Sequence, residues 1–337
     1  MASSRIKKEI LARVLLGIII LGIPLGIMIW GRLTSEPSLL VQAAIPENGG
    51  WNPGTIKTKV GQPLNLRFTS DDVVHGFSVG KLDFPEIDVI PGEVTQTSLI
   101  FSEPGRYIYY CTRWCSPNHW RMRGTIIVEG ESQVEELPDP PLYVVMGLDI
   151  DQPRQTDIIP EIKPSIKVGK DIMAAISREN LEPYLESSYL STKSPTEAWL
   201  SLRGETFSED LSDQDIWNLI AALWNSSTMP ESLRAGEQLF SQNCAACHGT
   251  EGDGEGIFAQ KYSPEEIGSS DLLKDITSPA DFTLPENMLA TSSAILEGKL
   301  LRGGMGTGMP NFGPIFTEME IWSIINFIWT FQFPGGS

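Results

Sequence analysis

The hydrophobic pattern of the chain begins with one long apolar run. Residues 14–30 hold no charged side chain, and with residues 10–12 the run approaches the ~20 residues that a helix needs to cross a bilayer. It is preceded by four basic residues: Arg5, Lys7, Lys8 and Arg13. This bias favours a cytoplasmic N-terminus and an exported remainder. A cleaved signal peptide is the alternative, but the run is longer than a signal core and no small-x-small site directly follows it. We therefore predict an uncleaved, single-pass membrane anchor within residues 1–33.

The pattern of residues 34–130 is that of an all-β domain. Short apolar runs at Leu64–Phe68, Tyr107–Tyr110 and Thr125–Val128 alternate with turn signals such as Pro104-Gly105. Regular short strands at this spacing predict a sandwich or barrel.

The remainder of the chain is acidic first and then helical. Residues 131–195 are rich in acids and prolines and predict a long connection with little core of its own. From Ser194 onward the apolar positions recur at helical spacing. The formal net charge of the whole chain is −18, which excludes a phosphate backbone as a natural partner, so we expect no nucleic acid.

Two thiols, one imidazole and one thioether fall within twelve residues of the predicted β-domain. They belong to Cys111, Cys115, His119 and Met122. Soft sulfur ligands beside imidazole select copper, and a second thiolate allows two metal ions to share both sulfurs. Outside the Cys-x-x-Cys-His motif described below, the further imidazole that such a site needs can come only from His75.

Two other interpretations of these side chains stay open. A disulfide between Cys111 and Cys115 suits an exported domain, but it would leave His75, His119 and Met122 unexplained. Zinc could take two Cys and two His, but it has no use for the thioether.

The pattern Cys-x3-Cys-x3-His-x2-Met, with an upstream His and a Pro-Gly-x-Tyr strand, resembles the CuA domain of haem-copper oxidase subunit II over residues 40–130. The resemblance implies a cupredoxin-like Greek-key fold and a binuclear copper centre, CuA. Its ligands would be two bridging thiolates, an imidazole on each copper, a weak thioether and a backbone carbonyl, from Cys111 and Cys115, His75 and His119, Met122, and Arg113. Many members carry Glu at the Arg113 position and use it toward a magnesium ion. Arginine cannot do this, so we expect no such ion.

A second constellation, Cys244-Ala-Ala-Cys247-His248, is the attachment motif of a c-type haem. The two thiols would form thioethers to the porphyrin and the adjacent imidazole would bind the iron. A zinc or redox motif is the alternative for these residues taken alone. Gly236 and Phe240, on a helix predicted from Pro230, resemble the first helix of class I cytochromes c.

The last helix of such a cytochrome would be supplied by residues 317–331, and the resemblance covers residues 230–334 of an all-α domain that we bound at 230–337. A glycine-rich loop precedes this helix and offers two thioethers. Met309, followed by Pro310, matches the family's loop and is the expected sixth ligand, with Met305 as the alternative. A Met/His pair raises the iron potential and suits electron transfer.

Two segments of the helical part have similar sequences. Leu211–Trp224 and Phe316–Trp329 both have a Ser or Thr N-cap, an acid in the first turn, and Ile and two Trp at helical spacing. Two interpretations stay open for residues 131–229. The likeness arises by chance between two capped helices in an acidic connector, or the segment is a second cytochrome-like domain that has lost its haem-bearing half.

All four cysteines and all three histidines are now assigned to metal centres, which leaves none for nucleophilic or histidine-based acid–base chemistry. A CuA domain and a cytochrome c on one anchor resemble subunit II of a caa-type oxidase in a prokaryotic plasma membrane. The resemblance implies that an external donor reduces the haem, the haem reduces CuA, and CuA reduces a polytopic catalytic haem subunit I that acts on dioxygen. The donor would be a c-type cytochrome, a small copper protein or a quinol-oxidising complex.

Two other roles stay open: the small subunit of a CuA-type nitric oxide reductase, and a free-standing membrane-anchored shuttle. Nitrous oxide reductase is excluded as this chain's own activity, because its catalytic copper cluster needs many histidines and none is spare. Charge adds a docking hypothesis. Arg113, Arg121 and Arg123 in the copper loop would attract the acidic haem domain, although solvated surface arginines are the plainer interpretation.

Overall fold

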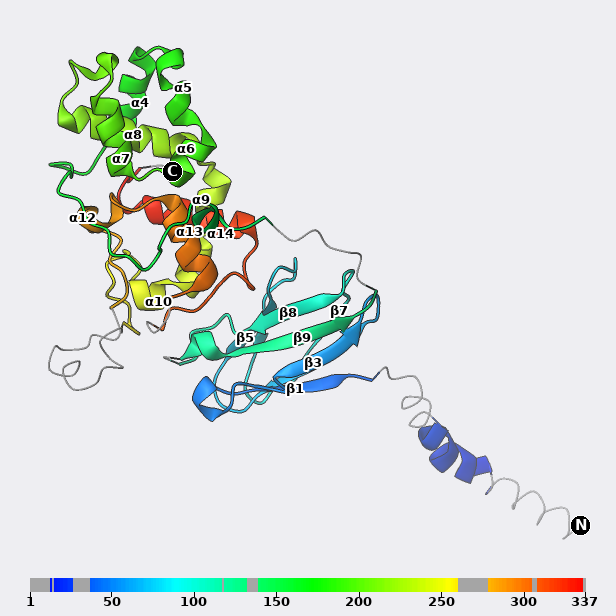
Figure 1. Cartoon of the computed structure of the whole chain (residues 1–337). Helices are drawn as coiled ribbons and strands as arrows, with labels where there is room; N and C mark the ends of the chain where they lie inside the picture. Colours follow the sequence, from blue (N-terminus) through cyan, green and yellow to red (C-terminus); the bar gives the residue numbers. More distant parts are fainter. Residues whose placement is uncertain are drawn as a thin grey trace, which may run out of the picture.

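The computed structural model describes residues 13, 15–26, 37–116, 118–131, 139–259, 278–304 and 308–335. Residues 15–26 of the N-terminal apolar run are helical and largely exposed, and they lie away from the rest of the molecule in Figure 1. Within the described ranges, no helix is long and apolar enough to cross a membrane. The predicted anchor at residues 10–30 lies partly outside those ranges.

The β-domain is a sandwich of two sheets (Figure 1). Its strands are β1 (Leu39–Ala43), β2 (Trp51–Asn52), β3 (Thr55–Lys59), β4 (Leu64–Ser70), β5 (His75–Val79), β6 (Ile87–Val89), β7 (Thr95–Leu99), β8 (Gly105–Tyr110) and β9 (Arg123–Glu129). One sheet has the order β2-β1-β4-β7 and the other β3-β9-β8-β5-β6. The pairs β1–β4 and β3–β9 are parallel, so the chain crosses between distant segments rather than forming simple hairpins.

Alternating side chains fill the space between the sheets. In β4, Leu64, Leu66 and Phe68 point inward while the intervening residues stay partly exposed, as period-2 alternation requires. Phe77 packs against Phe68 with ring centroids 4.4 Å apart. The predicted strands at 64–68, 107–110 and 125–128 are therefore confirmed. His75, the upstream imidazole of the copper pattern, begins β5.

The rest of the chain is helical. Its elements are α3 (Leu142–Val145), α4 (Ile166–Ala175), α5 (Arg178–Leu185), α6 (Ser187–Thr192), α7 (Pro195–Arg203), α8 (Asp213–Ser226), α9 (Pro230–Asn243), α10 (Ala245–His248), α12 (Pro285–Met288), α13 (Ser293–Arg302) and α14 (Glu318–Trp329). The helices predicted from Pro230 and at 317–331 are present as α9 and α14. One continuous apolar core joins the helices before residue 229 to those after it.

The expectation that residues 131–195 have little core of their own is wrong. Helices α4, α5 and α6 lie in this segment, and they bury Ile166, Leu181, Tyr184 and Leu190. The acids that dominate the composition stay on the solvent side, and three prolines (Pro153, Pro160 and Pro164) fall in the stretch between α3 and α4. Few apolar residues are enough here because α8 and the haem domain complete the core.

The two halves of the helical region repeat one helix crossing. In α4, a Cβ on Gly169 would lie 1.8 Å from the backbone oxygen of Asn218 in α8. In α9, a Cβ on Gly236 would lie 2.0 Å from the backbone oxygen of Ser323 in α14. Both contact residues sit five positions after the first residue of their helix. Glycine is therefore required at each crossing, where the two backbones touch.

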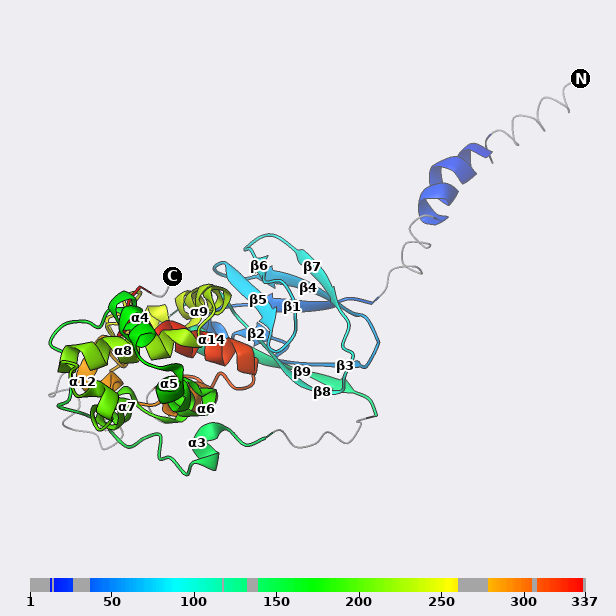
Figure 2. The same ribbon diagram turned by 90° about the horizontal axis from the view of Figure 1, so that it is seen from above.

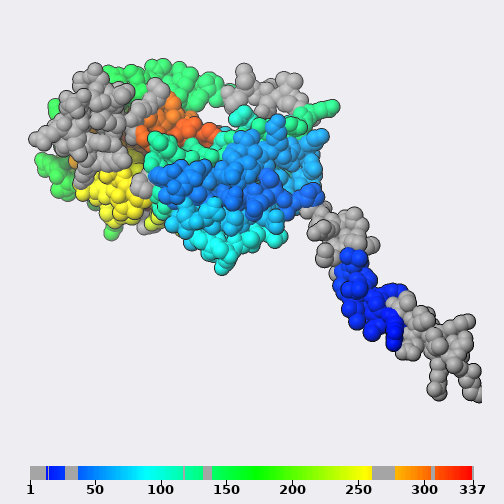
Figure 3. All heavy atoms as spheres, turned by 90° about the horizontal axis from the view of Figure 1, so that it is seen from below, coloured from blue at the N-terminus to red at the C-terminus, as the bar shows by residue number. Residues whose placement is uncertain are grey.

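The β-domain and the haem-motif domain are in direct contact (Figures 2 and 3). The backbone N–H of Lys81 donates to the carbonyl of Ile315 at 3.0 Å. A Cβ on Gly80 would lie 2.7 Å from the Cα of Ile315, so only glycine fits beside this contact. Lys81 has a φ of 61°, an unusual value for a residue with a side chain. Such a conformation persists only where its surroundings fix it.

Candidate metal centres

The segment that carries Cys111 to Met122 closes the end of the sandwich between β8 and β9. These two strands are antiparallel neighbours, so the start and the end of the loop meet: the N–H of Cys111 donates to the carbonyl of Met122 at 3.0 Å. The Trp51 indole N–H donates to the same carbonyl at 3.1 Å. Gly76, next to His75, lets the loop approach, because a Cβ there would lie 1.9 Å from the Thr112 hydroxyl.

This geometry brings together all the side chains that the sequence singled out for copper. The two Sγ atoms of Cys111 and Cys115 are 4.0 Å apart, too far for a disulfide. The Sγ of Cys115 lies 3.9 Å from the Sδ of Met122, and the Sγ of Cys111 lies 3.8 Å from Nδ1 of His75. Ligand atoms of His75, Cys111 and Cys115 all fall within 4.8 Å of one another.

The remaining two predicted donors lie at the same place. The carbonyl of Arg113 is 3.3 Å from the Sγ of Cys111. His119 begins a short 3-10 turn and is buried, and its Nδ1 has no hydrogen-bond partner in the described part of the chain. A buried imidazole nitrogen without a partner is costly unless it binds something. Together with the pair of thiols, this orphaned nitrogen fits a soft metal such as copper.

The pKa values of the Cys111 and Cys115 thiols are set by their neighbours in this cluster. The hydrogen bond with Cys115, and next the nearby imidazoles of His119 and His75, lower the pKa of Cys111 against the effect of burial. The same bond with Cys111, together with burial, raises the pKa of Cys115. Of the two thiols, Cys111 is therefore the one whose ionisation the site favours. Because metal binding needs both as thiolates, loading releases protons.

The charged neighbours of the centre are paired within the β-domain. Nε2 of His75 lies 2.8 Å from Oδ1 of Asp72, which orients the ring so that Nδ1 faces Cys111. The Arg113 guanidinium pairs with Asp88 at 2.8 Å and with Glu86 at 3.2 Å. Its side chain is therefore held away from the sulfurs while its carbonyl faces them.

The second centre sits where α9 ends and α10 begins. Cys244 caps α9, and α10 carries Cys247 and His248, so the motif folds as one helical turn on the end of a long helix. Burial raises the pKa of Cys244 to about 12 and raises that of Cys247. Both side chains are therefore neutral thiols at neutral pH.

Two neighbours fix the orientation of the His248 imidazole. Its Nδ1 lies 3.0 Å from the carbonyl of Ala280, so Nδ1–H donates and Nε2 keeps its lone pair. The ring stacks on Phe282 with centroids 4.7 Å apart. Burial lowers the pKa of His248. A neutral imidazole with Nε2 unprotonated is the form that binds haem iron.

Met309 lies half-buried between α13 and α14, packed against the helical core. Its carbonyl accepts from the N–H of Gly304 at 3.1 Å. Gly303, with a φ of 76°, permits this approach, because a Cβ there would lie 2.7 Å from the same carbonyl. Met305, the alternative ligand, lies outside the described residues.

Several contacts at these centres were not predicted from the sequence. They involve Asp72, Trp114, Phe258 and Asn311. The Asp-x-x-His spacing at residues 72–75 could have suggested the first of them. No local signal marks the others, because they meet partners from a different domain.

A sandwich with a sulfur and imidazole cluster at one end, joined to a helical domain with a haem-attachment motif, defines a protein of the copper- and haem-binding electron-transfer class. Comparison with known proteins agrees domain by domain. Residues 55–130 match the family described as cytochrome c oxidase subunit II, periplasmic domain, and residues 233–332 match the cytochrome c family.

Individual relatives extend this result. A cytochrome c oxidase subunit 2 from Thermus thermophilus is 36% identical over 80 residues, which are 24% of this chain and 58% of the relative. A second such subunit from the same species is 36% identical over 80 residues, which are 24% of this chain and 47% of that relative. The chain thus spans about half the length of these relatives.

Among solved structures, the periplasmic domain of cytochrome oxidase subunit II of Bradyrhizobium japonicum is 21% identical, with a TM-score of 0.22, over 29% of this chain and 88% of that domain. The family models thus match two separate parts of the chain, residues 55–130 and residues 233–332, and neither match covers half of it. The predicted resemblance, an oxidase subunit II domain fused to a cytochrome c domain, is confirmed.

Proposed function

We propose that this chain is subunit II of a haem-copper terminal oxidase and that it passes electrons from an external donor to a catalytic subunit I. The main support for the proposal is that the domains carrying the two candidate metal centres touch. A domain that resembles oxidase subunit II, with clustered thiols and imidazoles, lies in contact with a cytochrome-c-like domain. The family match of residues 55–130 supports the partnership with subunit I.

In this proposal the first cofactor is the binuclear copper centre CuA. Its holders are the donors gathered at the end of the sandwich: His75, Cys111, Cys115, His119, Met122 and the carbonyl of Arg113. When bound, the copper pair supplies one-electron chemistry. The chain's own part is to hold the imidazoles, through Asp72 for His75, and to keep the sulfurs in the shelter of the buried loop.

The second cofactor is one haem c, which Cys244 and Cys247 would hold covalently and whose iron His248 and Met309 would bind. The Ala280 carbonyl and the Phe282 ring hold the imidazole. Iron bound by a thioether and an imidazole would have a high potential, which suits a centre between an outside donor and a copper acceptor.

We also propose that the apolar run near the N-terminus anchors the chain in a prokaryotic plasma membrane, with both metal centres on the outer side. The charge bias ahead of the run and the periplasmic-domain family match support this placement. The test is alkaline extraction of membranes that express the full chain, with a version lacking residues 1–33 as the control. Release of the full chain by alkali would contradict an anchor.

For residues 139–229 we propose a cytochrome-like module without haem. The repeated glycine crossing supports it, and so does the spacing after each glycine. His248 lies twelve positions after Gly236, and the residue twelve positions after Gly169 is Leu181, which is buried in the core. An apolar side chain at this position cannot bind iron. The expected haem content is therefore one per chain.

The experiment that tests the proposed function is turnover by the purified membrane complex that contains this chain. We expect it to contain a polytopic haem subunit and to consume dioxygen with reduced donor. Consumption of nitric oxide instead would identify a nitric oxide reductase. Purification of the chain with no partner would leave a shuttle and refute the oxidase role.

A further inference from the structure

We propose that Trp114 and Phe258 form the electron bridge between the haem-binding segment and the copper-binding loop. The proposal rests on the proposed function and names the residues that carry its internal step. It assigns a role to two aromatic side chains that are not themselves candidate ligands.

The copper side of the bridge is the contact between Trp114 and His119. Trp114 lies between Arg113 and Cys115 in the loop, and its ring centroid is 4.6 Å from that of His119 with the planes tilted by 54°. This is van der Waals contact with the buried imidazole whose Nδ1 is orphaned. Trp114 itself is only half-buried, so one side of its ring faces out of the β-domain.

The haem side of the bridge begins at that outer face. The ring of Phe258 meets Trp114 edge-on, with centroids 6.0 Å apart and planes at 62°. Such T-shaped pairs are a favoured geometry for aromatic rings. Phe258 belongs to the segment that follows α10, so this contact joins the two predicted metal-binding segments directly.

Phe258 is coupled to the haem-attachment motif through its backbone. Its N–H donates to the carbonyl of Ala246, which lies between Cys244 and Cys247, at 2.7 Å. Gly256 makes this possible, because a Cβ there would lie 2.3 Å from the same carbonyl. A short chain of bonded and touching atoms therefore runs from the attachment motif through Phe258 and Trp114 to His119.

The domain contact keeps the two rings together. A guanidinium nitrogen of Arg123 donates to the carbonyl of Asn311 at 2.8 Å, and the Lys81 backbone is bonded to Ile315. Both contacts are separate from the ring pair, so replacing a ring does not release the domains.

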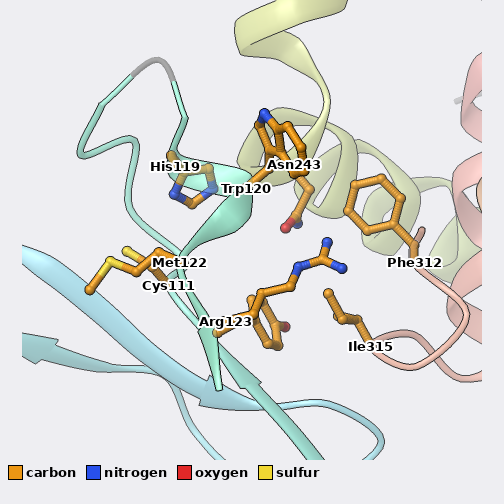
Figure 4. Close-up of a pocket in the computed structure, with 9 residues that line it drawn as sticks. Cys111, His119, Trp120, Met122, Arg123, Asn243, Phe312 and Ile315 are labelled. Carbon is orange, nitrogen blue, oxygen red and sulfur yellow. The ribbon is translucent and has the colours of Figure 1, made fainter. Parts of the chain in front are cut away.

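A second route crosses the same interface and is the competing candidate. A small cavity is lined by Cys111, His119, Trp120 and Asn243, among others, and it separates the copper loop from the end of α9 (Figure 4). Trp120 and Asn243 both line this cavity, but in the described part of the chain no aromatic ring of the helical domain pairs with Trp120. Contact through Trp114 is continuous, which is why we assign the bridge to it.

The step is a simple electron transfer. One electron leaves the haem iron, which changes from ferrous to ferric, and enters the oxidised copper pair, which becomes fully reduced. No bond is formed or broken and no proton moves. Trp114 and Phe258 supply the medium that the electron crosses and are not themselves oxidised.

The test uses the full chain in its complex, loaded with copper and haem. The haem is reduced by a light pulse and the reduction of copper is followed optically. We expect Trp114→Leu and Phe258→Leu each to slow this transfer severalfold, and Trp114→Phe, which keeps a ring, to slow it less. In the double variant we expect little further loss, because the loss of either ring already interrupts the route and leaves only slower alternatives. Trp120→Leu is the matched control on the same loop and should leave the rate unchanged.

Three further readouts separate a bridge from a structural role. The paramagnetic spectrum of copper and the midpoint potentials of both centres should be unchanged in the Trp114 variants. Hydrogen exchange at the Phe258 amide, measured without copper, should also be unchanged in Trp114→Phe. A Trp114→Leu rate equal to that of the parent chain, or a loss confined to Trp120→Leu, would overturn the proposal.

Failure of the proposed function gives a different result. A chain without a two-copper spectrum has no transfer to measure, although the exchange readout still reports the ring contact. A chain with both centres intact and a rate indifferent to Trp114 refutes the bridge alone.

Discussion

Arg121, at the end of the copper loop, and Arg123, the first residue of β9, are two residues apart, yet the structure gives them different roles. Arg123 donates from one nitrogen to the carbonyl and to the side-chain oxygen of Asn311, at 2.8 and 3.1 Å, and its guanidinium lies 5.8 Å from the centre of the Phe312 ring. Arg121 instead lies over Trp120 of its own domain, 4.8 Å from the ring centre. Replacing each arginine by glutamine therefore separates a domain contact from a surface charge.

The loss of docking free energy in Arg123→Gln can be worked out from the hydrogen bonds to Asn311 that it removes. A hydrogen bond to a charged group contributes about 1.5–3 kcal/mol when sheltered, and the two contacts here share one nitrogen, so they count as one. Arg123 is half-buried, and allowing for solvent screening leaves roughly 1–2 kcal/mol. Because each 1.4 kcal/mol is tenfold, Arg123→Gln should raise the undocked fraction by about 5- to 30-fold.

Burial lowers the pKa of Arg123 to about 10, so the guanidinium is charged at neutral pH and the bond is present under ordinary assay conditions. Docking can be measured by the distance between spin labels placed on the two domains. Internal electron transfer can be followed in the same samples. We expect a broadened distance distribution and slower transfer for Arg123→Gln, with Arg121→Gln unchanged in both.

The salt dependence distinguishes contact from steering. A half-buried bond is screened less than surface charges are, so transfer in the parent chain should change little between low and physiological ionic strength. If the two glutamine variants lost equal amounts of transfer rate, and if raising the ionic strength removed their difference from the parent chain, long-range attraction would govern docking. That outcome would refute the contact inferred here.

Three further predictions concern the haem site and the helical region. Met309→His should lower the haem midpoint potential in a redox titration, because the thioether raises it, while Met305→Leu should leave it unchanged; the reverse pattern would exchange the two ligands. Asp151 pairs with Arg302 and Lys299, and the first of these contacts chiefly lowers its pKa to about 2. Its folded pKa lies below the usual 3.8, so its stabilisation is present above pH 4 and is lost toward pH 2. Asp151→Asn should therefore cost ~0.5–1 kcal/mol of unfolding free energy at pH 7 and progressively less below pH 4; the same cost in acid would contradict the pairing. Gly169→Ala should destabilise the helical region by about 1–3 kcal/mol or more, because of the clash with α8, while Gly204→Ala, with 3.4 Å to its nearest neighbour, should not; equal denaturation midpoints would refute the crossing.

The sequence predicted most of what is local. Strand alternation at Leu64–Ser70 determined which side chains enter the sandwich, and the ligand spacing of the copper loop needed only adjacent antiparallel strands to close on itself. The attachment motif and its helix were equally local. Each of these features depends on residues close in the chain or on a pattern with one geometric solution.

What the sequence did not predict depends on distant contacts. Arg123 and Asn311 are 188 residues apart in the chain, and no sequence pattern around either residue predicts their hydrogen bond. The acidic, proline-rich composition of residues 131–195 did not predict helices α4 to α6. Each of these helices needs only a small apolar face, because α8 and the haem domain complete the core. The hydrogen bond from Lys81 to Ile315 likewise joins residues of different domains, so no local pattern predicts it.

The central claim is that two metal centres of different chemistry sit on one chain. Metal analysis of the purified full chain tests it most directly, together with a haem assay and a paramagnetic resonance spectrum. The account predicts two coppers and one covalently bound haem per chain, with a single unpaired electron shared by both coppers. Zinc in place of copper, or one copper with an isolated signal, would contradict it.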